Sequence, residues 1–280
     1  MEKVAVTGAT GYVGEKLVEK LILNGNFVHA IARNEGKLIE IKDKYKNVEI
    51  FPCPVEDEYL IKKAVKDCSG IYHLASFKEI NLAEKNALKT VQTNIFGTLN
   101  ILKASVDYPN IHFVIVASSD KAEKISGVYG ATKFIMEKLV EEFNFINQGQ
   151  CKYRILRFGN ILHSTSSVLV KWKKAILEGK DLVITDPSAT RYFLTREEAV
   201  AMIFECLETA TDSKPYFTKM KSLSLKELLD MMILKYGNGR KNNIIQIGLR
   251  EGENKHEKIS PDLTSEHAIR WNKEELYKEL

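Results

Sequence analysis

The sequence predicts an α/β protein that contains a doubly wound parallel sheet and, at its C-terminal side, a smaller lobe. Short apolar runs alternate with amphipathic segments from the start of the chain to about residue 160. These apolar runs are continuous, which is typical of parallel strands covered by helices on both faces. With 280 residues, the chain is long enough for one large domain and a small additional lobe.

The expected strands and helices of the first part follow one another in strict order. A buried strand is expected over residues 4–6 and a helix over 12–23, which ends at Asn24 and Gly25. Further strands are expected at 27–32, 48–51, 70–74, 112–117 and 153–158, and helices at 37–45, 58–66, 86–107 and 128–143. This alternation predicts a series of βαβ units.

The pattern changes after about Asn160, where the strands become shorter and the polar connections longer. Helices are expected at 168–177, 196–209 and 225–236, and extended segments at 182–185 and 243–247. We therefore expect one domain over residues 1–160 and a smaller substrate-binding lobe over 161–280, with a soft boundary across which segments can interleave.

Composition and charge argue against several classes of protein. The 41 Lys and Arg and 37 Asp and Glu residues give a net charge of +4, with scattered lysines, whereas a nucleic-acid-binding surface concentrates its positive charge. The four cysteines form no CxxC pair and the six histidines have no metal-binding spacing, so we expect reduced thiols, a cytoplasmic location and no metal site. No apolar run is long enough to span a bilayer and Met1 leads straight into a strand, so we expect neither membrane insertion nor a signal peptide.

A glycine motif follows the first strand. The sequence TGATGYVG places Gly8, Gly11 and Gly14 at the opening of a helix, where glycine lets a turn tighten and lets the backbone approach a pyrophosphate at the helix N-terminus. The motif predicts a Rossmann-like dinucleotide site. The second strand ends at Arg33 and Asn34, where an NAD site would carry an acid. Because a guanidinium group suits a 2′-phosphate, we expect NADP as the cofactor.

Ser119, Tyr129 and Lys133 form a second pattern. Ser119 directly follows the fifth expected strand, at the sheet edge where such folds bind ligands, and the next helix carries Tyr129 and Lys133 one turn apart. A tyrosine and a lysine at this spacing also occur as exposed neighbours on a helix, but the position of this pair at the sheet edge favours a catalytic role. Lys133, with a cationic nicotinamide, would lower the pKa of Tyr129. Tyr129 could then take a proton from an alcohol hydroxyl while hydride leaves the carbon, and Ser119 would hydrogen-bond the same oxygen.

The motifs TGATGYVG, SSDKA and YGATK together resemble the extended short-chain dehydrogenase/reductase superfamily. Further motifs are LASFKE, QTNIFGTLN, LRFGN, ITDPSATRYFLT and IGLREGENKHE. With them, the chain more closely resembles UDP-N-acetylglucosamine 4,6-dehydratases of the pseudaminic-acid type, which act in polysaccharide biosynthesis. The resemblance covers nearly the whole chain. One departure lies after the third strand, where Pro54 replaces the acid that usually contacts the adenine.

The resemblance implies roles for individual residues. Ser119, Asp120 and Lys121 match the dehydration group of these enzymes, and Tyr129 and Lys133 match the pair that acts in the hydride step. The expected cofactor-binding residues are Gly8, Thr10, Gly11, Tyr12, Val13, Gly14, Arg33, Asn34, Asp57, Ala75, Ser76, Asn94, Tyr129 and Lys133. The expected substrate-binding residues are Lys78, Asn160, Arg191, Arg250 and Glu253.

The implied reaction is the NADP-dependent 4,6-dehydration of UDP-N-acetylglucosamine or a close UDP-hexosamine, with or without inversion at C5. It is redox-neutral, because the hydride that leaves C4 returns to C6 after water is eliminated across C5 and C6. The resemblance assigns the C5 proton to Lys121 and the proton for the departing oxygen to Asp120. Lys121 must then be neutral at least transiently, which burial and the charge of the neighbouring nicotinamide would favour. Relatives of this type usually self-associate, so a homo-oligomer is expected too.

Two other functions compete with this hypothesis. A sugar-nucleotide 4-epimerase or 4-keto reductase that uses NAD or NADP would need only the serine, tyrosine and lysine, so the pair Asp120 and Lys121 favours a dehydratase. That pair could also merely cap the next helix. A non-catalytic NADP-binding regulator would keep the glycine motif and lose Tyr129 or Lys133, and both are present.

Overall fold

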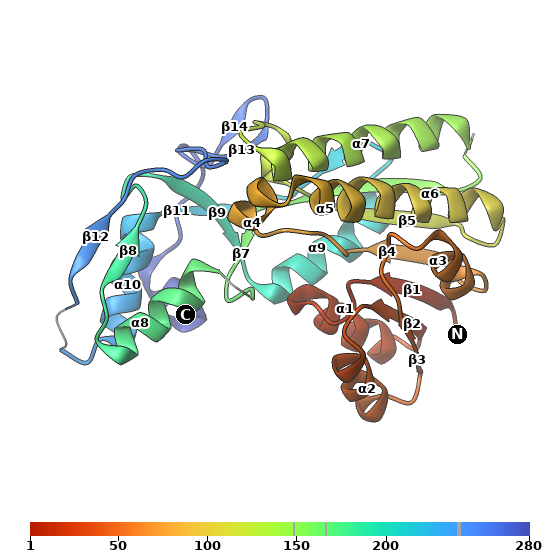
Figure 1. Cartoon of the computed structure of the whole chain (residues 1–280), viewed down its shortest axis with the longest axis horizontal. Coiled ribbons are helices and arrows are strands. Elements are labelled where there is room, and N and C mark those ends of the chain that lie inside the picture. The colour runs from red at the N-terminus through yellow and green to blue at the C-terminus, as the bar shows by residue number, and fades with distance from the viewer. Residues whose placement is uncertain (148, 166, 240–241) are drawn as a thin grey trace.

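A parallel seven-stranded sheet forms the centre of the computed structural model, which describes residues 1–147, 149–165, 167–239 and 242–280 (Figure 1). The strands are β1 (Lys3–Thr7), β2 (Phe27–Ala32), β3 (Val48–Pro52), β4 (Gly70–His73), β5 (Phe113–Ser119), β6 (Lys152–Phe158) and β10 (Pro215–Tyr216). Their order is β10-β6-β5-β4-β1-β2-β3. The predicted doubly wound parallel sheet is therefore confirmed, and its topological switch point lies between β1 and β4.

Helices cover both faces of this sheet because successive side chains of each strand point to opposite faces. In β1, Val4 and Val6 join one apolar core and Ala5 joins the other. The first core is completed by α1 (Tyr12–Leu23), α2 (Glu35–Lys44) and α9 (Arg196–Thr209). The second is completed by α3 (Glu58–Val65), α6 (Gly97–Asp107) and α7 (Val128–Ile146).

The long helix expected at 86–107 is interrupted by a π-helical turn. It consists of α5 (Ala87–Val91), the π-helical turn Gln92–Phe96 and α6, and it is preceded by a further helix, α4 (Ile80–Lys85), that was not predicted. The wide turn carries Asn94, whose side-chain oxygen accepts hydrogen bonds from the Phe77 amide at 2.7 Å and the Ser76 hydroxyl at 3.0 Å. A π-turn of this kind often marks a functional region, and here it fixes the loop that leaves β4.

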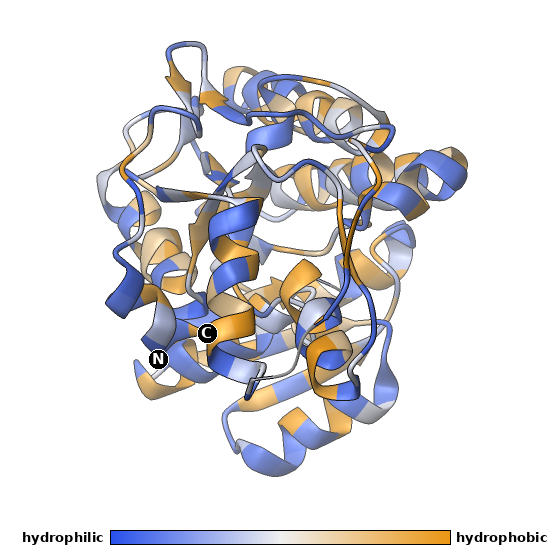
Figure 2. Cartoon of the chain, turned by 90° about the vertical axis from the view of Figure 1, so that its left-hand side faces the viewer, coloured by the Kyte–Doolittle hydropathy of each residue, from blue (hydrophilic) through white to orange (hydrophobic). Residues whose placement is uncertain are grey.

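The smaller lobe lies beside the sheet, at the left of Figure 1. Its elements are β7 (Asn160–Ile161), α8 (Val168–Glu178), β8 (Leu182–Ile184), β9 (Thr190–Leu194), β11 (Lys221–Ser224), α10 (Leu225–Tyr236), β12 (Ile244–Gln246) and α11 (Lys273–Glu279), whereas the hairpin of β13 (Lys258–Ser260) and β14 (Leu263–Thr264) contributes Ile259 to the first sheet core. The elements of the lobe enclose a third apolar core that includes Trp172, Phe193 and Leu228. Figure 2, which views the molecule from this side, shows helices that carry both hydrophobic and hydrophilic bands, as surface helices do.

The chain passes more than once between the sheet domain and the lobe. After β9, helix α9 returns to the first sheet core, and β10 then pairs with β6 at Pro215 and Tyr216. Residues 161–280 thus do not form one continuous lobe, because the segment 196–216 belongs to the sheet domain. The short strand β10 carries little of the sequence pattern of a strand, since it has only two residues.

Arg157, near the end of β6, joins the sheet to the C-terminal part of the chain. Its guanidinium group donates to both carboxylate oxygens of Glu137 on α7, at 2.8 and 2.7 Å, and to the carbonyl oxygen of Ile259 in β13, at 2.8 Å. The Arg157 and Glu137 side chains are 7% and 2% exposed. This buried ion pair holds β13, and the residues just before it, against the carboxyl end of β5.

Candidate functional site

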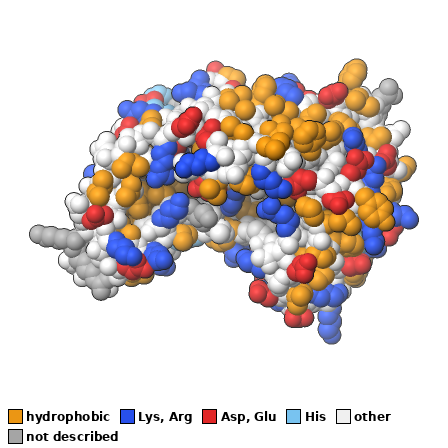
Figure 3. All heavy atoms as spheres, in the orientation of Figure 1, with side chains coloured by type: hydrophobic (Ala, Val, Ile, Leu, Met, Phe, Trp, Pro, Cys, Tyr) orange, Lys and Arg blue, Asp and Glu red, His pale blue; other side chains and the backbone are white. Residues whose placement is uncertain are grey.

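A cavity of about 1120 Å³ lies between the sheet domain and the lobe. It opens where β1, β2, β4, β5 and β6 end, because the register of the sheet aligns the carboxyl ends of these strands; Ser119, for example, pairs with Phe158. Figure 3 shows the surface hollowed between the lobe and the sheet domain, with Lys and Arg side chains near the hollow. Ligands of open α/β sheets bind in this location.

The glycine motif forms a cradle at one end of the cavity. Gly8 has φ +71°, and a Cβ atom there would lie 2.9 Å from the amide nitrogen of Ala75. A Cβ atom on Gly14 would lie 2.1 Å from the carbonyl oxygen of Gly8. Both positions therefore require glycine, and the N-terminus of α1 is left open toward the cavity. This arrangement fits the pyrophosphate of a dinucleotide.

Buried polar side chains support this cradle from below. His73 in β4 is hydrogen-bonded through Nδ1 to the Thr7 hydroxyl at 2.7 Å and through Nε2 to the Thr98 hydroxyl at 3.1 Å. Burial lowers the pKa of His73 to about 3, so the ring is neutral and acts as a structural connector. It links β1, β4 and α6 directly beneath the cavity.

Most of the expected cofactor residues line this cavity. They are Gly8, Thr10, Gly11, Tyr12, Val13, Gly14, Arg33, Asn34, Ala75, Ser76, Tyr129 and Lys133. Arg33 is exposed at the end of β2, where it is free to meet a ligand, whereas the Asn34 side chain caps α2 by accepting from the Lys37 amide at 3.0 Å. Two expected residues do not line the cavity. Asp57 caps α3 by accepting from the Leu60 amide at 2.9 Å, and Asn94 is fully buried behind the loop that it fixes.

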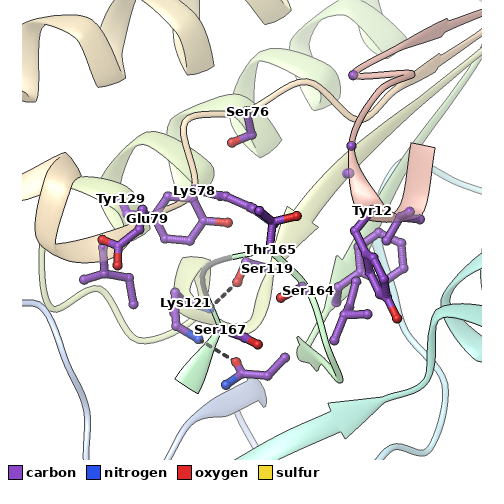
Figure 4. A pocket seen from close by; sticks show the side chains of 18 of the residues that line it. Tyr12, Ser76, Lys78, Glu79, Ser119, Lys121, Tyr129, Ser164, Thr165 and Ser167 are labelled. Carbon is purple, nitrogen blue, oxygen red and sulfur yellow. Dashed lines mark hydrogen bonds between the residues drawn. The ribbon is translucent and has the colours of Figure 1, made fainter. Parts of the chain in front are cut away.

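The catalytic candidates meet at the end of β5, where a single 3₁₀ turn (Asp120–Ala122) follows Ser119. Ser119 Oγ and Lys121 Nζ each donate to Asp120 Oδ1, both at 2.9 Å. Figure 4 shows Ser119, Lys121 and Tyr129 on one side of the cavity, with Tyr12 across from them. Ser119, Lys121, Tyr129 and Lys133 line the cavity. Asp120 does not: its side chain is fully buried behind the others, and its Oδ2 atom has no hydrogen-bond partner.

In the protein alone, the pKa of Tyr129 lies above its ordinary value. Burial raises it to about 12, although Lys121 and the hydrogen bond from Ser119 pull it down. Lys133 was expected to lower it, but burial lowers the pKa of Lys133 itself to about 7, and its ammonium group donates to the carbonyl oxygen of Ala117 at 2.8 Å. Desolvation thus dominates the pKa of both groups in the protein alone, and the combined effect of Lys133 and a bound nicotinamide on Tyr129 stays a prediction.

For Lys121, burial acts in the expected direction, toward the neutral form, but it does not decide the net shift. Burial does lower the pKa of Lys121, but the carboxylates of Asp120 and Glu257 more than offset it, so the net shift is upward. Burial raises the pKa of Asp120, against the attraction of Lys121. The two desolvated groups lie 2.9 Å apart, and each partly offsets the effect of burial on the other.

Five expected substrate residues surround the rest of the cavity, namely Lys78, Asn160, Arg191, Arg250 and Glu253. Asn160 Oδ1 lies 3.4 Å from Lys121 Nζ, within reach of the same ammonium group. Burial lowers the pKa of Lys78. Sequence reasoning missed Glu257, whose Oε1 atom lies 3.6 Å from both Lys121 Nζ and Arg191 Nε. Its only signal was its place at the end of the IGLREGENKHE motif.

Across the residues that the structure describes, no cluster of His, Cys, Asp and Glu side chains could hold a metal ion. In the same part of the chain, no helix combines the length and the apolar character that crossing a membrane requires.

The fold and the cavity define an extended short-chain dehydrogenase/reductase. More narrowly, the chain belongs to the polysaccharide biosynthesis protein family, whose sequence model matches residues 4–278. The solved structure of Pen from Bacillus thuringiensis shares this fold, with a TM-score of 0.92 and 24% identity over 99% of this chain and 96% of that one.

Relatives of the chain carry different names. A protein of Methanocaldococcus jannaschii, described as an uncharacterized membrane protein, is 31% identical and covers 98% of this chain and 83% of its own. The inverting UDP-N-acetylglucosamine 4,6-dehydratase of Campylobacter jejuni is 29% identical and covers 91% of this chain and 76% of its own. The UDP-glucose 4-epimerase of Rickettsia akari is 26% identical, with the same coverage of 91% and 76%.

The glycine cradle gives a prediction about dinucleotide binding. Gly8→Ala should weaken binding of NADP or NAD at least about tenfold, because the new Cβ would displace the loop at Ala75 and strain a positive φ that costs an L-residue about 1–2 kcal/mol. Gly25→Ala is the matched control, since Gly25 has φ +84° but no atom near its Cβ position. Isothermal titration calorimetry measures dinucleotide binding by both variants, and circular dichroism checks that both are folded. Equal binding by the two variants would argue against a pyrophosphate in the cradle.

Proposed function

We propose that the protein is an NADP-dependent sugar-nucleotide 4,6-dehydratase that acts on UDP-N-acetylglucosamine or a close UDP-hexosamine. The observation that carries this proposal is the buried ion pair of Asp120 and Lys121, which lies beside Ser119 and Tyr129 at the end of β5. A sugar oxidised at C4 needs a base for its C5 proton and an acid for its C6 oxygen. This pair offers both, on the loop that already carries Ser119.

The first proton transfer is assigned to Tyr129. Its hydroxyl takes the proton of the sugar hydroxyl at C4, and Ser119 hydrogen-bonds the same oxygen. When bound, NADP would accept the hydride from C4, return it at C6, and favour the tyrosinate through its cationic ring. Lys133 is held one turn after Tyr129 by its bond to Ala117 and lines the same cavity.

The second stage is assigned to Lys121 and Asp120. The new ketone at C4 acidifies the C5 proton, because the carbanion that remains is an enolate. Moving one proton across the 2.9 Å bond from Lys121 Nζ to Asp120 Oδ1 converts the ion pair into a neutral amine and a neutral acid. Burial favours the neutral forms of both groups, so a small change in their surroundings can shift this balance. The amine can then take the C5 proton.

Asp120 would deliver its proton indirectly. Because it does not line the cavity, a proton that leaves it passes through Ser119 or Lys121, the two cavity-lining residues that its Oδ1 contacts. A 4-epimerase or 4-keto reductase remains the alternative function, since either would use Ser119, Tyr129 and Lys133 alone. Neither would need a desolvated ion pair at this position.

NADP is proposed as the cofactor, because Arg33 lines the cavity at the tip of β2, where a 2′-phosphate would lie. A cytoplasmic location is proposed as well. It suits the four cysteines, which are all free and buried thiols.

A homo-oligomer is proposed from an apolar face on α5, α7 and the π-turn. Leu88, Phe96, Phe134 and Ile135 are all exposed there. Figure 3 shows hydrophobic side chains gathered over these helices. Exposed apolar patches of this kind are typical of protein interfaces.

The product identifies the reaction. Purified protein incubated with UDP-N-acetylglucosamine and NADP should form a 4-keto-6-deoxy product, seen by mass spectrometry as the loss of one water, without accumulation of NADPH. Lys121→Ala should slow product formation at least about hundredfold and abolish exchange of the C5 proton with deuterated solvent, because a positioned base contributes roughly a hundredfold or more. It should still reduce bound cofactor, whereas Tyr129→Phe should not.

Lys124→Ala is the matched control for Lys121→Ala, since Lys124 is exposed on the same segment. A product of unchanged mass would indicate an epimerase, and NADPH released in proportion to product would indicate a simple dehydrogenase. Exchange at the wild-type rate in Lys121→Ala would exclude Lys121 as the base.

Arg33 gives a prediction about cofactor choice. Arg33→Ala should weaken NADP binding about tenfold or more, because a charge-assisted hydrogen bond contributes about 1.5–3 kcal/mol, while NAD binding should change little. Calorimetric titration with both dinucleotides measures the difference. An equal loss for NADP and NAD would contradict the assignment of NADP.

The apolar face gives a prediction about assembly. Light scattering coupled to gel filtration should give a mass of at least twice that of one chain. Ile135→Glu should reduce this mass to that of one chain, because a carboxylate in a buried interface is costly. A monomeric wild-type protein would refute the homo-oligomer.

A further inference from the structure

Glu257 lies at the cavity although neither the glycine motif nor the SSDKA and YGATK motifs contain it. It directly precedes β13 and reaches the end of β5 because Arg157 binds β13 at Ile259. Its side chain is 1% exposed, yet it lines the cavity. Its Oε2 atom accepts from the Asn254 amide at 3.3 Å, and its own backbone amide donates to the Ser265 hydroxyl at 2.9 Å. The first bond holds the carboxylate, and the second holds the backbone from which the side chain extends.

The fixed carboxylate completes a group of four charges. Lys121 Nζ lies 2.9 Å from Asp120 Oδ1 and 3.6 Å from Glu257 Oε1, and Glu257 Oε1 also lies 3.6 Å from Arg191 Nε. Two cations and two anions leave the group neutral when all four are ionised. Tyr129 is a further titratable group that interacts with Lys121. Without Glu257, the same site would hold an excess positive charge away from water.

We propose that Glu257 is a positioning residue for Lys121, whose carboxylate holds the Lys121 amine at the cavity wall and increases the affinity of that amine for a proton. This inference rests on the proposed dehydratase function only for its catalytic consequence. The effect of the Glu257 carboxylate on the Lys121 amine does not depend on any substrate or cofactor.

The catalytic consequence follows from the direction of the effect. When the Lys121 amine takes the C5 proton of the oxidised sugar, the C–H bond breaks, its electron pair enters the enolate, and the amine becomes an ammonium ion. Glu257 stabilises that ammonium ion, so it strengthens Lys121 as a base. Arg191 shares the same carboxylate oxygen and limits how strongly Glu257 acts. Loss of the Glu257 charge should lower the pKa of Lys121. The amine would then be neutral at lower pH, but it would be a weaker base for the C5 proton.

The charge relationship can be tested without substrate or cofactor. Lys121 is 11% exposed at its side chain and lines the cavity, so acetic anhydride can reach it, and only the neutral amine reacts. An opposite charge within about 4–6 Å shifts a pKa by about 1 unit or more. Glu257→Gln should therefore increase the acetylation rate of Lys121 at least about threefold at about pH 9, relative to exposed Lys124, as measured by peptide mass spectrometry.

Two variants separate charge from shape. Glu257→Asp keeps the charge and should acetylate at close to the wild-type rate. Glu266→Gln removes a half-exposed carboxylate from the same part of the chain, outside the cavity. This variant should leave the acetylation rate of Lys121 unchanged. Equal acetylation of Lys121 in wild type and Glu257→Gln would overturn the inference, as would an increase in Glu257→Asp as large as that in Glu257→Gln.

Activity then provides a separate measurement. If the wild-type protein dehydrates a UDP-hexosamine, Glu257→Gln should lower the maximum rate of C5 exchange and shift its pH midpoint downward, and an unchanged profile would count against the inference. If the wild-type protein dehydrates no such substrate, the proposed function fails. An increase in Lys121 acetylation that is specific to Glu257→Gln would still support the charge relationship.

Discussion

The buried ion pair between Arg157 and Glu137 is the interaction on which the geometry of the site depends. Its guanidinium group lies between α7, which carries Tyr129 and Lys133, and β13, which follows Glu257. Asn160, which lines the cavity, follows Arg157 by three residues in the chain. Removing one partner of such a pair leaves an uncompensated buried charge, which costs about 3–5 kcal/mol. The pair thus fixes the relative positions of residues from distant parts of the sequence.

The site itself is built from charges that are largely removed from water. Asp120 and Glu257 are almost completely buried, and Glu257, Lys121 and Arg191 line the cavity. Each of these ions would be costly alone, but together they compensate one another. A neutral group of this kind keeps its members ready to exchange protons, because moving one proton within it changes no net charge.

Local patterns were sufficient to predict six of the seven strands of the sheet and much of the site. The glycine motif, Ser119 and Tyr129 each lie directly after a strand or within the first turns of a helix, so the alternation of strands and helices placed them at one edge. Three features were not accessible in this way. The π-turn at Asn94 depends on its bonds to the loop at Ser76, and Glu257 depends on a tertiary contact that local sequence does not encode. The pKa shifts of Tyr129 and Lys121 depend on desolvation, which requires the packed structure.

The return of α9 and β10 to the sheet affects how the chain can fold during synthesis. The sheet lacks its edge strand next to β6 until residue 216 has left the ribosome, and by then α8, β8 and β9 of the lobe have already been made. The two parts therefore cannot fold strictly one after the other from the N-terminus, as successive domains generally do. A chain that stops near residue 160 would leave β6 as an open edge strand, which favours aggregation through unpaired backbone groups.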